Sequence, residues 1–151
     1  MKNLTEAKRR MMDAEDCLRT AQELFLAKLY RGCVQNSQSC VELCAKAVIS
    51  IFSEPDWTHD PGRQLQAILK SHKAEFDKVV SEELIRLAQN ATELAPWHGK
   101  TTYGEEMQGE FVPAVELCTE EKAEWALGKA KIAFDVANKF LTRWFEAGRQ
   151  D

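Results

Sequence analysis

The strongest constraint on the fold is a helical repeat of apolar residues near both ends of this 151-residue chain. Near the N-terminus, apolar residues recur at alternating steps of three and four, at Leu4, Ala7, Met11, Ala14, Leu18, Ala21 and Phe25. Beyond Thr119 the same spacing continues through Ala123, Leu127, Ala130, Phe134, Ala137 and Leu141. This period places the apolar side chains along one face of a helix. It predicts two long amphipathic helices, one from residue 4 to about 28 and one after Thr119.

Residues 31 to 53 are predicted to form a more deeply buried helix. Its apolar residues fill two adjacent lines, one with Cys33, Cys40, Cys44, Ala47 and Ile51 and the other with Val34, Val41, Val48 and Phe52. So broad an apolar surface is typical of a helix that packs against more than one neighbour. The stretch SEPDWTHDPG then interrupts the helix, and Pro61 suits the start of the next one.

The remaining chain predicts two more helices and one long loop. A short helix begins at Gly62, a break falls near 71–73, and a longer helix covers about 75–95. Residues 96–118 contain three Gly and two Pro without a sustained helical period, which predicts the loop, locally extended around GEFVPAV. We therefore expect an all-α fold, a single domain over 1–151. It is an up-and-down antiparallel bundle of four long helices plus a short extra helix.

Charge and hydropathy exclude several classes of protein. The net charge of -4 argues against DNA binding and against any broad basic surface for nucleic acid. No apolar run approaches the roughly 20 residues that span a bilayer, and the N-terminal residues lack the apolar core of a signal peptide. The sequence therefore predicts a cytoplasmic protein without a membrane partner.

The cysteines predict neither disulfides nor a metal centre. Their number, five, is odd, and the chain has no export signal, so free thiols are expected. Cys33, Cys40 and Cys44 share a helix face, but a structural zinc site needs four ligands and no second Cys or His pair has a matching spacing. We expect them to act as small buried hydrophobic residues, and we expect neither a metal nor another cofactor.

A polar row interrupts the buried helix within QSCVELCAKA. Gln38, Glu42 and Lys46 are spaced by four residues, and Glu before Lys is the favourable order for an ion pair, worth about 0.2–0.5 kcal/mol on an exposed face. The row faces solvent, is buried with its hydrogen bonds made, or lies at a dimer seam or the rim of a cleft. The alternatives differ in desolvation. A buried charge is destabilised when its partner is lost, whereas a charge exposed to solvent is hardly affected.

The segment PWHGKTTYG is the best candidate for a ligand site. Trp97, His98, Lys100 and Tyr103 combine two aromatic rings, an imidazole and a cation, which suit stacking on a base and contact with a phosphate. Alternatively, the two aromatic residues anchor the loop on the bundle. The pair His59–Asp60 suggests a local turn or cap, because a catalytic dyad would also need a nucleophile.

The stretch LYRGCVQNSQSCVELCAKAVIS resembles the HEPN family, in which a run of the type Gln-x-x-x-Glu-x-x-x-Lys-Ala lies on the second helix. The matching positions are Gln38, Glu42, Lys46 and Ala47, and the resemblance extends to TTYG and the Ala-rich final helix. It implies a helical bundle that forms homodimers, with a small nucleotidyltransferase as a partner, as in toxin–antitoxin pairs. It also implies a nucleotide or RNA as ligand.

Some members of that family are metal-independent ribonucleases with an Arg and a His four to six residues apart on the last helix. The three His of this chain, at 59, 72 and 98, have no Arg at that spacing before them. We therefore assign no catalytic residue and expect a non-catalytic binding or accessory protein. The alternative is a divergent ribonuclease whose catalytic residues meet across a dimer.

Overall fold

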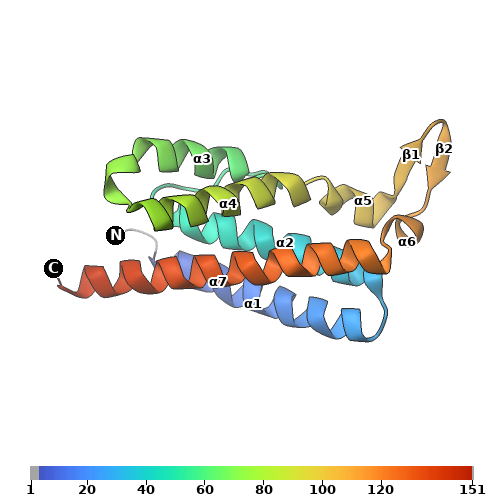
Figure 1. Ribbon diagram of the computed structural model, residues 1–151, viewed down its shortest axis with the longest axis horizontal. Helices are drawn as coiled ribbons and strands as arrows, with labels where there is room; N and C mark the ends of the chain where they lie inside the picture. The colour runs from blue at the N-terminus through green and yellow to red at the C-terminus, as the bar shows by residue number, and fades with distance from the viewer. Residues whose placement is uncertain (1–3, 151) are drawn as a thin grey trace.

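Four long helices lie side by side and alternate in direction (Figure 1). They are α1 (Leu4–Leu26), α2 (Tyr30–Ser50), α4 (Lys78–Leu94) and α7 (Glu120–Gln150). The computed structural model describes the backbone of residues 4–150 and the side chains of residues 4–144 and 146. Within this part, no helix is both long and apolar enough to cross a membrane. The predicted all-α, up-and-down bundle is confirmed.

Shorter elements connect the long helices. Helix α3 (Gly62–Ser71) and a 3-10 turn (Lys73–Glu75) precede α4, so the predicted break near 71–73 is confirmed.

The prediction of one long loop over 96–118 is wrong. This segment forms α5 (Trp97–Tyr103), an antiparallel hairpin of β1 (Glu105–Met107) and β2 (Glu110–Val112), and α6 (Ala114–Leu117). These elements are too short to produce a periodic signal, and Gly104 and Gly109, both at positive φ, allow the turns between them.

Helix α2 is the centre of the bundle and contacts α1, α3, α4, α5, α6 and α7. Its Cys33 and Cys40 thiols donate to the backbone oxygens of Ala123 and Ala130 in α7, at 3.9 and 3.8 Å. Small residues on both helices permit this close approach, and Cys44 is fully buried nearby. The prediction that this helix packs against several neighbours is confirmed, and a polar residue on its buried face, such as Gln38, is largely desolvated.

The connection between α2 and α3 is fastened to α4 through Asp60. Its Oδ1 accepts from the backbone N–H of Gly62 at 3.2 Å and from the Thr92 hydroxyl at 2.8 Å. Gly62 allows the approach, because a Cβ there would lie 2.1 Å from Thr92 Oγ1 and 2.4 Å from the Ala88 oxygen. The predicted turn at Asp60 is confirmed, and this fastening fixes the start of α3 directly after His59.

A Gly62→Ala substitution should therefore destabilise the protein. A Cβ would collide with α4, and overpacking of this kind costs about 1–3 kcal/mol. Gly128→Ala is the matched control, because its Cβ would meet nothing within 4 Å inside α7 and Ala favours a helix by about 1 kcal/mol. Urea denaturation should give a lower unfolding free energy for Gly62→Ala and a higher one for Gly128→Ala. Equal free energies for the two variants would contradict this packing.

Candidate functional site

The polar row of α2 is largely buried, and hydrogen bonds link its three residues in turn. Gln38 is 1% exposed, and its Nε2 donates to Glu42 Oε1 at 3.1 Å. Lys46 Nζ donates to the other carboxylate oxygen, Oε2, at 3.2 Å. The side chains of Glu42 and Lys46 are each 14% exposed. Of the alternatives that the sequence left open, the structure therefore excludes a row that faces solvent.

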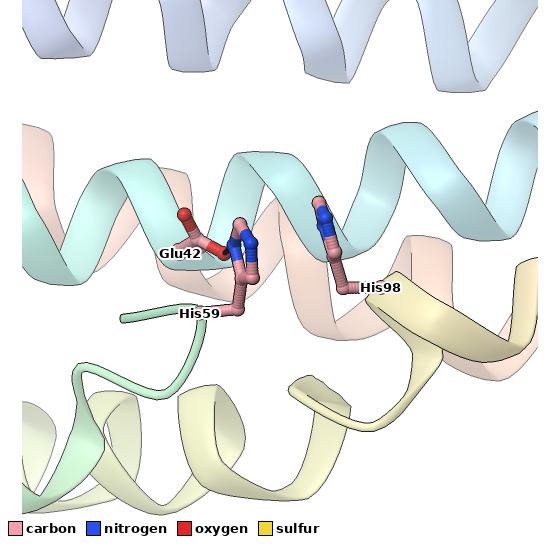
Figure 2. Close-up of side chains that lie close together, drawn as sticks. All are labelled: Glu42, His59 and His98. Carbon is pink, nitrogen blue, oxygen red and sulfur yellow. Dashed lines mark hydrogen bonds and ion pairs between the residues drawn. The ribbon is translucent and has the colours of Figure 1, made fainter. Parts of the chain in front are cut away.

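Two histidines from different segments meet at Glu42 (Figure 2). His59, from the connection between α2 and α3, places its Nδ1 3.1 Å from Glu42 Oε1. His98, from α5, stacks on the ring of His59 with 3.5 Å between centroids and 16° between planes. A carboxylate and two imidazoles from three separate segments therefore converge at one point on the bundle.

Arg31, in the first turn of α2, helps to hold α5 in this position. Its Nε donates to the backbone oxygen of Thr101 at 2.6 Å and its Nη2 to that of Thr102 at 3.2 Å. Carbonyl groups in the last turn of a helix lack intrahelical partners, so these bonds satisfy the end of α5. Thr101 is fully buried and donates through its hydroxyl to the Trp97 oxygen. These contacts fix α5, and with it His98, against α2.

A cavity of about 390 Å³ opens beside His59. Its lining residues come from α1, α2 and the α2–α3 connection, and they are Arg10, Lys46, Glu54, Pro55, Asp56, Trp57, Thr58 and His59. The Trp57 indole is fully exposed. Arg10 is bound through Nη2 to Glu6 at 2.6 Å, while its buried Nε has no hydrogen-bond partner among the described residues. The cavity thus offers an aromatic surface together with side chains of both charges.

The four residues predicted for a ligand site occupy different surroundings. Trp97 packs against the core, and the Nζ atoms of Lys100 and Lys122 each lie 4.9 Å from the centroid of its ring. Lys100 also pairs with Glu105 at 3.4 Å. Tyr103 is 78% exposed, whereas His98 contacts His59. The structure brings Trp97 and Lys100 together and directs His98 to a second cluster, and ligand binding by the four remains a prediction.

The cysteines are free thiols within the described part of the chain, as predicted. Burial raises the pKa of Cys17 to about 11, and burial also raises the pKa of Cys33 and Cys118. A hydrogen bond with Cys40, followed by burial, raises the pKa of Cys44 well above its ordinary value. Because only a thiolate acts as a nucleophile or a strong metal ligand, these side chains serve packing at neutral pH.

Comparison with known proteins identifies the family. The HEPN domain model matches residues 7–140, which is most of the chain, and the protein therefore belongs to the HEPN domain family. Searches of curated proteins and of solved structures each gave no match. Membership in this family is consistent with binding of nucleotide or RNA and also with a ribonuclease-like role.

Sequence reasoning missed Arg10 and Trp57 and did not place His59 beside His98. A signal was available for Trp57 and His59, because SEPDWTHDPG concentrates an aromatic ring and an imidazole in a segment that interrupts a buried helix. Arg10 lies on an otherwise ordinary charged helix face, which gives no comparable signal. Its role depends on how α1 packs beside α2.

Because the Glu42–Lys46 pair is mostly buried, loss of Lys46 should lower the unfolding free energy more than loss of a lysine from an exposed ion pair. Lys46→Met leaves a mostly buried carboxylate without one of its donors and should lower the unfolding free energy by about 1–3 kcal/mol. Lys139, whose side chain is 46% exposed, binds Glu83 at 3.0 Å, and Lys139→Met should cost less than about 1 kcal/mol. Chemical denaturation measures both values. A cost for Lys46→Met no larger than that for Lys139→Met would show that the row is not desolvated.

Proposed function

We propose that the protein binds a nucleoside phosphate, either as a free nucleotide or as a unit of RNA, in the cavity beside Glu42, His59 and His98. Recognition, without cleavage of the ligand, is its activity. The observation that carries the proposal is the combination of an exposed indole with the positive side chains of Arg10 and Lys46 around one cavity. Membership in the HEPN family supports the same class of ligand.

The charges around the cavity suit a nucleotide better than a simple anion. Arg10 and Lys46 supply donors for phosphate oxygens, and an imidazole N–H of His59 can add another. Glu54 and Asp56 would repel a free phosphate, but their carboxylates can accept from ribose hydroxyls or base amino groups. A ligand with an anionic end and a donor-rich end matches a wall of mixed charge.

Trp57 provides the surface for the base. An indole that is fully exposed gains no burial from the fold, and base stacking on an aromatic side chain contributes about 1–3 kcal/mol per base. The residues predicted from sequence, Trp97, His98, Lys100 and Tyr103, extend this proposal. His98 connects the two sets because it stacks on His59, which lines the cavity.

The alternative function is metal-independent cleavage of RNA. It is favoured by the contact of His59 Nδ1 with Glu42 and by the adjacent ring of His98, since a carboxylate-oriented imidazole beside a second imidazole suits general acid–base catalysis. The sequence of α7 contains no His, so it lacks the Arg and His, four to six residues apart, of the family's ribonucleases. This argues against RNA cleavage. The binding hypothesis therefore comes first.

Binding can be tested by calorimetry with ATP and with a short single-stranded RNA. Trp57→Ala should weaken binding at least about fivefold, the equivalent of ~1 kcal/mol of stacking. Phe111→Ala is the matched control, because it removes an aromatic ring, 64% exposed, from the hairpin, and it should leave the affinity unchanged. Both positions are exposed, so both variants should fold.

Three outcomes would change the assignment. Absence of binding to either ligand would contradict the proposal. If Tyr103→Ala weakens binding and Trp57→Ala does not, the ligand binds at the α5 residues instead of the cavity. Cleavage of the RNA in the presence of EDTA, abolished by His98→Ala, would establish the ribonuclease instead.

The proposal also includes that the protein forms a homodimer and pairs with a nucleotidyltransferase. Both follow from the resemblance of the Gln38, Glu42 and Lys46 run to the HEPN family, and family membership supports them. A role in a toxin–antitoxin pair is proposed on the same ground. Because all the residues that line the cavity, Lys46 of the row among them, belong to one protomer, nucleotide binding as proposed needs no residue from a second copy.

A further inference from the structure

We infer that Glu42, His59 and His98 form a binding site for a divalent transition-metal ion, with Zn²⁺ as its representative. The inference goes beyond the proposed nucleotide binding and does not depend on it. One ligand atom from each residue lies within 4.8 Å of the other two. Two imidazole nitrogens and one carboxylate oxygen are the set found in zinc sites that keep a coordination position open for water or substrate.

The spacing at Glu42 is close to that of a metal bridge. An imidazole nitrogen and a carboxylate oxygen, each bound to Zn²⁺ at about 2.0–2.2 Å in tetrahedral geometry, are separated by about 3.4 Å. His59 Nδ1 and Glu42 Oε1 are 3.1 Å apart. The third ligand atom, on His98, lies within 4.8 Å of the other two, so a movement on the order of 1 Å brings it to the separation expected in a tetrahedral site. His59 can adjust toward His98, because its side chain is 59% exposed and belongs to a connection between helices.

The surroundings of Glu42 are those of an oriented metal ligand. Gln38 Nε2 donates to Oε1 and Lys46 Nζ to Oε2, so the carboxylate is held in one rotamer by buried or nearly buried partners. Outer hydrogen bonds of this kind fix a ligand's orientation and commonly change metal affinity 10–100-fold. Glu42 is the rigid member of the site, and the two imidazoles move toward it.

The two imidazole rings lie in nearly parallel planes, with 16° between the planes and 3.5 Å between the centroids. Because each nitrogen lone pair lies in the plane of its ring, one ring must turn before both nitrogens can bind the same ion. Lys46 opposes a cation, but its Nζ lies at the far carboxylate oxygen. A phosphate in the adjacent cavity would offset the excess positive charge.

A titration of the metal-free protein with Zn²⁺ alone tests the inference. We expect binding of one equivalent, a higher Tm with the ion present, and a visible absorption band when Co²⁺ replaces Zn²⁺. His59→Ala and His98→Ala should each weaken Zn²⁺ binding by more than about tenfold, since each removes a direct ligand. His59 is exposed, so His59→Ala should retain the fold, and far-UV circular dichroism checks this.

His72→Ala is the matched control for the metal site. His72 contacts Glu75 and packs against the tilted ring of Phe52, so it forms a His–Glu pair without a second imidazole, and its loss should leave Zn²⁺ affinity unchanged. Trp57→Ala should also leave it unchanged, which separates the metal site from the proposed nucleotide site. Absence of Zn²⁺ binding, or binding that His59→Ala leaves intact, would overturn the inference whatever the result with nucleotide.

Discussion

The carboxylate of Glu42 is the charge around which the site is organised. It lies on the most buried helix, α2, so it has lost much of its hydration and needs donors from the protein. Gln38 and Lys46 supply two of them from its own helix, and His59 supplies a third contact from outside it. His59 thereby holds the α2–α3 connection against α2, and the cavity forms between this connection, α2 and α1.

Much of the fold could be predicted from the sequence because the long helices carry periodic apolar faces. The stripes from Leu4 and from Ala123 predicted α1 and α7, and the two apolar lines through Cys40 and Val41 predicted a central helix. Residues 96–118 could not be predicted in this way. Helix α5 and the hairpin are shorter than the window over which a period can be recognised, and Arg31, 70 residues before Thr101, holds α5 in place.

The candidate site was predictable only in part. The run Gln38, Glu42 and Lys46 was visible as a polar row, yet the sequence could not decide between solvent, a cleft and a partner, because that depends on what covers α2. His59 and His98 are 39 positions apart, and their stacking results from two separate fastenings, Asp60 on α4 and Arg31 on α5. Pairings fixed by tertiary contacts leave no local pattern, whereas an ion pair at four-residue spacing does.

The most direct test of the account is to follow the imidazole signals of the three histidines by NMR while nucleotide is added to saturation in the absence of metal. His59 and His98 lie at the proposed site, whereas His72 is engaged with Glu75 and the ring of Phe52. The signals of His59 and His98 should shift together, and the signal of His72 should stay where it is. Saturated binding with His59 and His98 unmoved would contradict this account.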